Sequence, residues 1–197
     1  MMTNFIHYFK LCASRFRRTI IYSCITVILA LVLMGKREYL VKFVSADMVN
    51  TRPKDVWEYV SDFSNMMRLN PTIMKFIITH ESANLNQWNY TVEYEEYLSQ
   101  LPFVTNKIVG NFVIFKNSIP HYAIKSNHRT CFANLYCLYT HAEMQFLSTP
   151  KNGTRIVEII KYECPWTLSR FCFNEIKYQR NKIFGQLQSM EFWQDKH

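Results

Sequence analysis

The sequence predicts an α+β fold in which a curved antiparallel sheet wraps on a long C-terminal helix, preceded by one N-terminal transmembrane helix. Short segments with strand-like alternation fill the middle of the chain, a helical apolar stripe follows residue 165, and an uncharged apolar stretch lies near the N-terminus. In such a fold the helix covers the concave face of the sheet. Any volume that the inward side chains leave unfilled is an apolar cavity.

The positive charge of the chain is concentrated at its N-terminal end. The 197 residues include 23 Lys+Arg and 15 Asp+Glu, a formal net charge of +8. Residues 1–46 hold seven of the bases and one of the acids, so this segment carries +6 and the remaining residues +2. The nearly neutral body lacks the basic surface of a nucleic-acid binder, and nucleic acid is not a predicted partner.

The apolar stretch Thr19–Met34 has no charged residue, no Pro and no Gly, and its 16 residues are flanked by Lys and Arg. A helix of that length spans about 24 Å, short for a hydrocarbon core of about 30 Å, but flanking basic side chains can snorkel to the headgroups. We therefore expect a basic tail at 1–18, a transmembrane anchor at 19–34 and a folded domain at 40–197, with the lipid bilayer as a partner.

Two other interpretations of this N-terminal segment are a cleaved signal peptide and a mitochondrial presequence. A cleaved signal peptide is disfavoured because Met34-Gly35-Lys36-Arg37 lacks the small residues of a cleavage site. A mitochondrial presequence remains an alternative, since the first 37 residues contain no acid. The predicted location is therefore single-pass in the endomembrane system or plasma membrane, with the mitochondrion as alternative.

The orientation of the anchor is weakly indicated. Four bases precede the apolar stretch and three follow it, which leans toward a cytosolic N-terminus and a lumenal or extracellular body. Sequons at Asn89-Tyr90-Thr91 and Asn152-Gly153-Thr154 agree with that orientation. The Asn, Ser and Thr content alone yields about two sequons by chance, so this agreement adds little.

The pattern of residues 40–197 predicts a series of strands with two helical segments. The predicted strands cover 40–50, 75–83, 88–97, 107–115, 122–131, 136–148 and 154–164. An Asn-Gly pair at Asn152-Gly153 predicts a hairpin turn between the last two strands. A helix follows Pro53, with Thr51 as its expected N-cap. The long C-terminal helix is expected from Thr167 or Ser169, as its cap, to about Trp193.

The segment 88–97 indicates a half-buried strand with an aromatic inner face. Trp88, Tyr90, Val92 and Tyr94 alternate with polar residues at period two. We expect these aromatic side chains to form core or cavity wall, where a buried Tyr hydroxyl needs a polar partner.

Arg180 interrupts the apolar stripe of the C-terminal helix at a position where an apolar residue is expected. A cation on the inner side of this helix can hold the polar headgroup of a ligand, and Glu158, on the inner face of its strand, is the expected partner. The alternative is that the Arg180 head snorkels to the rim while only its stem packs.

The segment Asp55–Pro71 resembles the START-like (SRPBCC, Bet v 1-like) helix-grip superfamily. The positions that match its opening motif are Pro53, Val56, Trp57, Val60, Asp62, Phe63, Asn70 and Pro71. Leu69 departs from the motif, because many relatives have Trp there. The resemblance covers residues 40–195 in element order, and the coenzyme Q-binding and polyketide-cyclase-like branches look nearest.

The resemblance implies a cavity under the C-terminal helix that binds or transfers a hydrophobic molecule such as a lipid, sterol or quinone. The predicted ligand-binding residues are Trp88, Tyr90, Tyr94, Phe112, Glu158, Arg180, Ile183 and Leu187. No catalytic residue, cofactor or metal is predicted. The superfamily shares no catalytic set, so the fold alone does not decide the function.

Two other functions remain open. One is an enzyme of the polyketide-cyclase type, which uses cavity Tyr, His or Glu as acid and base. The other is an interaction module whose core is filled. A void of about 300 Å³ or more favours ligand binding over a filled core. A cluster of titratable groups with shifted pKa values inside the cavity favours the enzyme.

The cysteines leave two alternatives. The pattern H-x2-C-x5-C-x3-H, from His128 to His141, looks like a zinc site, but His128 and Cys131 point to opposite faces of a regular strand. Cys131–Cys137 and Cys164–Cys172 are possible disulfides in an oxidising compartment, and buried free thiols are the alternative.

Overall fold

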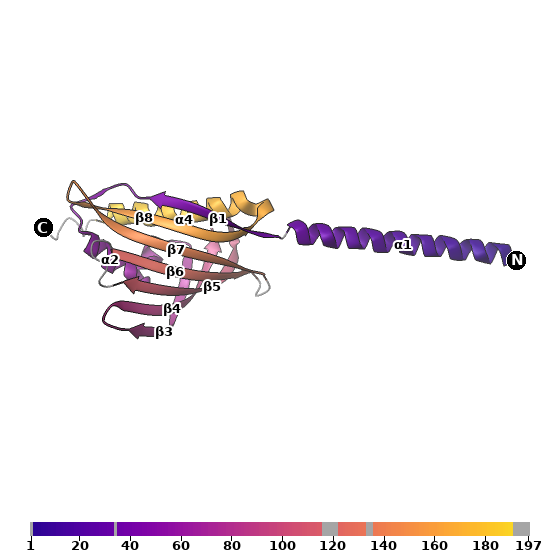
Figure 1. The fold of residues 1–197 in the computed structure, drawn as a ribbon, viewed down its shortest axis with the longest axis horizontal. Coiled ribbons are helices and arrows are strands. Elements are labelled where there is room, and N and C mark those ends of the chain that lie inside the picture. The colour runs from indigo at the N-terminus through magenta and orange to yellow at the C-terminus, as the bar shows by residue number, and fades with distance from the viewer. Residues whose placement is uncertain (1, 34, 116–121, 133–135, 191–197) are drawn as a thin grey trace.

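The computed structural model describes residues 2–33, 35–115, 122–132 and 136–190. A helix, α1 (Met2–Leu33), precedes a domain of strands and helices (Figure 1). The strands are β1 (Lys36–Val44), β2 (Met48–Val49), β3 (Ile73–Ala83), β4 (Gln87–Leu98), β5 (Leu101–Phe115), β6 (Tyr122–Phe132), β7 (Tyr136–Thr149) and β8 (Gly153–Pro165). The helices of the domain are α2 (Pro53–Ser61), α3 (Phe63–Leu69), the short 3-10 helix η1 (Trp166–Leu168) and α4 (Ser169–Ser189).

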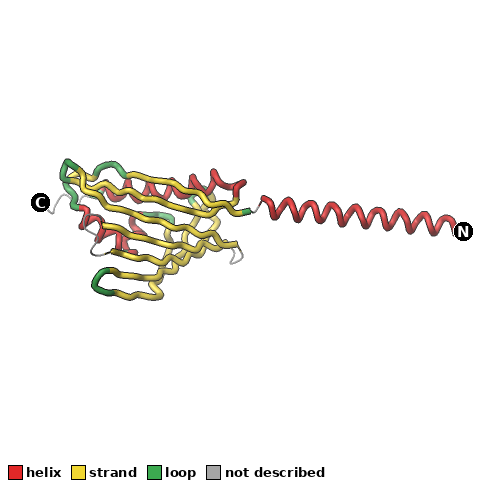
Figure 2. Tube along the Cα trace, viewed as in Figure 1, coloured by secondary structure: helices red, strands yellow, loops and turns green. Residues whose placement is uncertain are grey.

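The strands form one antiparallel sheet with the order β1-β8-β7-β6-β5-β4-β3, and β2 pairs with the start of β8. The first strand therefore lies beside the last one, and β1 and β3 are the edges. Helix α4 runs along one face of the curved sheet, and α2 and α3 pack over the same face (Figures 1 and 2). The predicted curved antiparallel sheet with a long C-terminal helix is confirmed.

The inward side chains of the sheet alternate as the sequence pattern predicts. In β8, for example, Ile156, Glu158 and Ile160 are buried, whereas Arg155 and Ile159 are exposed. The inner faces of the strands and the helices α2, α3 and α4 share one apolar core. Burial of this apolar surface is the main force that holds α4 against the sheet.

The hairpin between β7 and β8 has the predicted Asn-Gly turn. Asn152 adopts a left-handed backbone conformation, with φ 51°. A Cβ atom at Gly153 would collide with the carbonyl oxygen of Met48. The absence of a side chain at Gly153 thus lets β2 pair directly with the start of β8.

The predicted helix caps are wrong at both helices. Arg52 occupies the N-cap position of α2, and the Thr51 hydroxyl donates to the carbonyl oxygen of Met48 at 2.8 Å. Leu168 occupies the N-cap position of α4, and the Thr167 hydroxyl donates to the Leu33 carbonyl at 3.1 Å. Both threonines bond to neighbouring segments instead of capping. The described part of α4 ends at Ser189, and the predicted end near residue 193 lies outside the described residues.

Helix α1 has 32 residues and extends away from the domain (Figures 1 and 2). Among the residues that the structure describes, no helix combines the length and apolarity needed to cross a membrane. The transmembrane helix predicted over 19–34 is therefore not found. Met34, its last residue, lies outside the described residues.

Both disulfide pairings are confirmed. Cys131 and Cys137 face each other across β6 and β7, and their bridge closes that hairpin. Cys164, at the end of β8, is bridged to Cys172 in the first turn of α4. The alternative of buried free thiols is wrong for these four cysteines. Because the first bridge occupies both thiols of the H-x2-C-x5-C-x3-H pattern, they cannot serve as zinc ligands.

Candidate functional site

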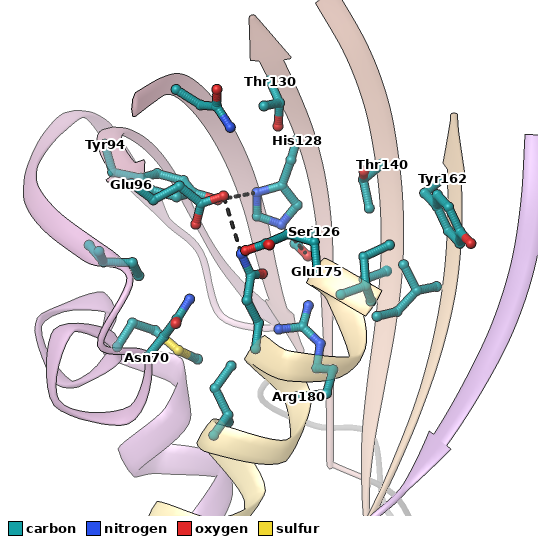
Figure 3. A pocket seen from close by; sticks show the side chains of 18 of the residues that line it. Asn70, Tyr94, Glu96, Ser126, His128, Thr130, Thr140, Tyr162, Glu175 and Arg180 are labelled. Atoms are coloured by element: carbon teal, nitrogen blue, oxygen red, sulfur yellow. Dashed lines mark hydrogen bonds between the residues drawn. The ribbon is translucent and has the colours of Figure 1, made fainter. Parts of the chain in front are cut away.

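A cavity of about 190 Å³ lies between α4 and the inner face of the sheet. One part of its wall is apolar, with side chains from α3, β5, β6, β7 and α4. These are Phe63, Phe112, Ile124, Met144 and Ile183. The other part is polar and is shown in Figure 3. An apolar wall with a few converging polar groups is typical of a small-molecule site.

The volume limits what the cavity can hold. It is below the volume of about 300 Å³ that is expected to favour ligand binding over a filled core, and that drug-sized ligands occupy. It exceeds the roughly 150 Å³ of an engineered apolar cavity that admits benzene. The core of the domain is therefore not completely filled, and the cavity suits a molecule with one or two rings rather than a complete lipid.

The predicted pair of Arg180 and Glu158 is present at the polar wall. Arg180 Nε lies 2.6 Å from Glu158 Oε2, and the two side chains are only 16% and 2% exposed. This arrangement confirms the ion pair and excludes the alternative in which the Arg180 head snorkels to the rim. Burial raises the pKa of Glu158, and the neighbouring Arg180 opposes that rise.

Glu96 approaches Arg180 from β4, on the opposite wall. Its side chain is buried, and Gln179 Nε2 of α4 donates to Glu96 Oε1 at 3.3 Å (Figure 3). Burial raises the pKa of Glu96 to about 7, although the bond from Gln179 opposes the rise; the nearby Glu175 carboxyl adds to it. Glu96 can therefore gain or lose a proton near neutral pH.

Glu175 fixes the start of α4 against the turn between β4 and β5. Its carboxylate accepts from the Ser99 backbone N–H at 2.8 Å and from the Ser99 hydroxyl at 2.7 Å. In addition, Gln100 Nε2 donates to the carbonyl oxygen of Phe171 at 2.9 Å. These bonds join the first turns of α4 to the turn between β4 and β5, and so connect the helix wall of the cavity to its sheet wall.

His128 lies between Tyr94 and Ser126 on the floor of the cavity. Its Nδ1 is 3.1 Å from Tyr94 Oη and its Nε2 is 2.9 Å from Ser126 Oγ (Figure 3). Burial, with Arg180 and His141 nearby, lowers the pKa of His128 to about 3, so the imidazole is neutral at physiological pH. Gly110 makes room for this ring, because a Cβ atom there would lie 2.9 Å from His128 Nδ1.

Five of the eight predicted ligand-binding residues line this cavity: Tyr94, Phe112, Glu158, Arg180 and Ile183. The other three do not. The Tyr90 hydroxyl donates to the Ser61 carbonyl and Trp88 Nε1 donates to Glu81, while Leu187 is fully buried. The inner face of β4 runs past the cavity into a filled part of the core, where Tyr90 stacks on Phe112. Period-two alternation predicts the face of a side chain but not which part of that face borders a void.

The sequence interpretation missed Glu96, Asn106, Glu175 and Gln179 as cavity residues. A signal was available for Glu96, because it continues the inward period-two series of Tyr90 and Tyr94. Asn106 belongs in the same way to the inward series of Phe112 on β5. The positions of Glu175 and Gln179 depend on how α4 is rotated against the sheet, which the apolar stripe indicates only approximately.

A second hollow, of about 530 Å³, lies on the other side of the sheet, against β3 to β6. Charged side chains contribute much of its wall, among them Lys75, Glu95, Lys107 and Arg129, and Lys75 pairs with Glu95 at 3.0 Å. Such a wall cannot remove a hydrophobic molecule from water as the cavity under α4 can. The smaller cavity is therefore the candidate site.

No family model and no curated protein matches the chain. Solved structures do match. The ZhuI aromatase/cyclase from Streptomyces sp. R1128 is 10% identical, with a TM-score of 0.56 over 78% of this chain and 92% of that one. A protein from Thermus thermophilus, TTHA0849, is 9% identical, with a TM-score of 0.55 over 77% and 94%. Ara h 8.0201 is 11% identical, with a TM-score of 0.53 over 79% and 100%.

These similarities show the fold and not the activity, because the sequence identities are so low. The chain has the helix-grip fold that the resemblance of the segment between Pro53 and Pro71 predicts.

Proposed function

We propose that this protein binds a small hydrophobic molecule in the cavity under α4. The observation that carries the proposal is the unfilled volume of about 190 Å³, with an apolar wall at one end and buried polar groups at the other. Each 100 Å² of apolar ligand surface removed from water contributes about 2.5 kcal/mol, which favours binding. The polar groups then set the orientation of the ligand, because they must not remain unpaired in the complex.

Filling the cavity is expected to abolish ligand capture. Ala142 of β7 lines the cavity, and Ala142→Leu would place three further carbon atoms in it. Native mass spectrometry of the full-length protein, purified from its host, is expected to show a co-purified small molecule whose occupancy falls at least tenfold in Ala142→Leu. Gly185→Ala is the matched control, because nothing lies within 4 Å of a Cβ atom at Gly185. Equal occupancy in all three proteins would contradict the proposal.

A second candidate function is acid–base catalysis on the bound molecule, as in the polyketide-cyclase alternative. The observation that favours it is the convergence of Tyr94, Glu96 and His128 on one cavity, with a Glu96 pKa of about 7 that suits proton transfer. The same spectra distinguish the two functions. An enzyme would release a compound of changed mass, for example after loss of water, and Glu96→Gln would retain the unreacted compound.

We also propose that the stretch 19–34 holds the domain at a membrane, with the body in an oxidising compartment, although no helix among the described residues meets the length and apolarity of a span. The apolar stretch 19–34 and its basic flanks support the anchor. The two disulfides support an oxidising compartment. Trp166 Nε1 donates to the Val32 carbonyl at 3.0 Å, which joins α1 to the end of the domain from which it leaves.

The distribution of exposed aromatic residues supports the same arrangement. Outside α1, the exposed aromatic side chains in the described part of the chain are Phe103, Tyr139, Trp166 and Phe173. All four lie toward the end of the domain next to α1, where β1, β5 and β7 begin and β8 ends. Aromatic side chains favour the interface between a membrane and water.

Membrane association and orientation can be measured together. The full-length chain is expected to stay with membranes after alkaline carbonate extraction and to shift in mobility on glycosidase treatment. Asn152 is exposed at a hairpin tip, whereas Asn89 lies inside β4 with its Oδ1 buried. Asn152→Gln should therefore abolish the shift and Asn89→Gln should not. Complete extraction by carbonate would contradict the anchor, and an unmodified chain would contradict the lumenal body.

A further inference from the structure

The cavity contains more acidic than basic groups. Four carboxyl groups border it together with one guanidinium group, that of Arg180; they belong to Glu96, Glu158, Glu163 and Glu175. Glu163 has its own cation, because it pairs with Lys36 at 3.4 Å. Arg180 is already paired with Glu158 at 2.6 Å, and His128 is neutral.

The two remaining carboxyl groups are bonded to uncharged partners. The carboxyl group of Glu96 is bonded to Gln179 and Thr72. The carboxyl group of Glu175 accepts from the Ser99 backbone N–H. The two ion pairs therefore leave acidic groups in the cavity without a cation of their own.

A second observation points to a missing hydrogen-bond donor at the same place. Asn106 lines the cavity, is only 1% exposed, and its Oδ1 has no hydrogen-bond partner in the described part of the chain. Asn106 of β5 is directly opposite Glu96 of β4 in the sheet register. Opposed side chains on one face of an antiparallel pair lie about 5 Å apart at their Cβ atoms. A buried acceptor without a partner costs free energy, so a ligand that supplies a donor here recovers that loss.

We propose that Glu96 and Asn106 hold the ammonium group of an amine ligand whose apolar body lies against Phe112 and Ile183. An ammonium group has three donors and no acceptor, so it can bond to the carboxylate and the amide oxygen at once. Its charge also balances the excess of carboxyl groups. The inference rests on the proposed hydrophobic-ligand function and adds the chemical class of the ligand. It differs from an acidic ligand on Arg180, because the charge of Arg180 is already balanced by Glu158.

Three probes with the same phenyl body test the headgroup. They are 2-phenylethylamine, 3-phenylpropionate and ethylbenzene, each titrated into the full-length protein at pH 8 by calorimetry. Glu96 faces Gln179, Glu175 and Arg180 of α4 as well as Thr72, and is ionised at this pH. The amine is expected to bind at least tenfold more tightly than ethylbenzene, and the propionate more weakly than ethylbenzene.

Two variants separate the headgroup contact from the cavity itself. Glu96→Gln should reduce the affinity for the amine to that for ethylbenzene, while the affinity for ethylbenzene stays unchanged and shows that the cavity is intact. Asn106→Val should weaken amine binding about fivefold and raise the thermal stability, since it removes an unpaired buried oxygen. Gly185→Ala, away from the cavity, should leave the affinities for all three probes unchanged.

The outcomes distinguish this inference from the function on which it rests. Equal affinities for the amine and ethylbenzene, or a preference for the propionate, would overturn the amine inference and leave hydrophobic binding standing. Unchanged amine binding in Glu96→Gln would also overturn it. If none of the three probes binds, both proposals fall.

Discussion

Replacing Arg180 by Met is expected to lower the free energy of unfolding by about 3–5 kcal/mol, because Glu158 would remain buried without its cation. The Glu158 side chain is 2% exposed and Arg180 Nε is 2.6 Å from its carboxylate. The measurement is urea unfolding of the full-length protein at pH 7, with the midpoint and slope fitted separately.

Two further variants make this prediction specific. The double variant Arg180→Met/Glu158→Met should recover most of the lost stability, since a buried ion pair replaced by apolar groups is often neutral or stabilising. Arg155→Met is the matched control, because Arg155 Nε lies at a similar 2.7 Å from Asp47 but that pair is exposed. Its effect should be a small fraction of that of Arg180→Met. A similar loss of unfolding free energy in Arg180→Met and Arg155→Met would show that burial does not determine the effect of removing the cation.

Deprotonation of Glu96 is expected to make the protein less stable as the pH rises from about 4.5 to 7. Burial raises the pKa of Glu96 from 4.5 to about 7 in the folded protein. Between these values the folded state holds a proton that the unfolded state has lost, so stability falls as the pH rises. Above about pH 7 both states are ionised and this contribution becomes constant. The total loss is about 3 kcal/mol, at about 1.4 kcal/mol per pKa unit.

Glu96→Gln isolates this effect, because the amide is isosteric and cannot ionise. The difference in unfolding free energy between the variant and the parent should change by about 3 kcal/mol in favour of the variant between pH 4.5 and pH 8. Carboxyl groups that do not interact with Glu96 contribute equally to both proteins and cancel. A difference that is independent of pH would show that Glu96 titrates alike in the folded and unfolded chains. Urea midpoints of both proteins across this pH range provide the measurement.

These two predictions concern buried polar groups of the same cavity, and together they relate ligand binding to stability. An unfilled volume and buried carboxyl groups both lower the stability of a core. Natural proteins retain such features chiefly where a function requires them. Loss of ligand binding together with a gain of stability in Glu96→Gln at pH 8 would be the expected signature of that compromise.

The order of the elements could be predicted from local patterns. Alternation of apolar and polar residues predicts the strands, the Asn152-Gly153 pair predicts the hairpin turn, and an apolar stripe predicts α4. The motif from Pro53 to Pro71 predicts the helix-grip fold. The inward parity of Glu158 and the anomalous position of Arg180 on an apolar stripe predicted their ion pair. Each of these features depends on residues close in sequence, or on one charge placed where apolar residues are expected.

The caps and the borders of the cavity could not be predicted in this way. Thr51 and Thr167 are sound local N-cap candidates, yet their hydroxyls bond to carbonyl groups of Met48 and Leu33. Trp88 and Tyr90 share the inward face of β4 with Tyr94, but the void ends before it reaches them. The hydrogen bonds of the two threonines and the border of the cavity both depend on how distant segments pack. The sequence of a single strand or helix does not indicate that packing.

The sequence alone thus determined the curved sheet, the long helix, the two disulfide candidates and an internal Arg–Glu pair, because side-chain periodicity and charge are local properties. Only the tertiary structure decided that the void is about 190 Å³ and that Glu96, Asn106 and His128 meet there. These residues come from three different strands, and their convergence depends on sheet register, on the rotation of α4 and on the missing side chain at Gly110. The volume left over is a small difference between large packed volumes, and no local pattern encodes it.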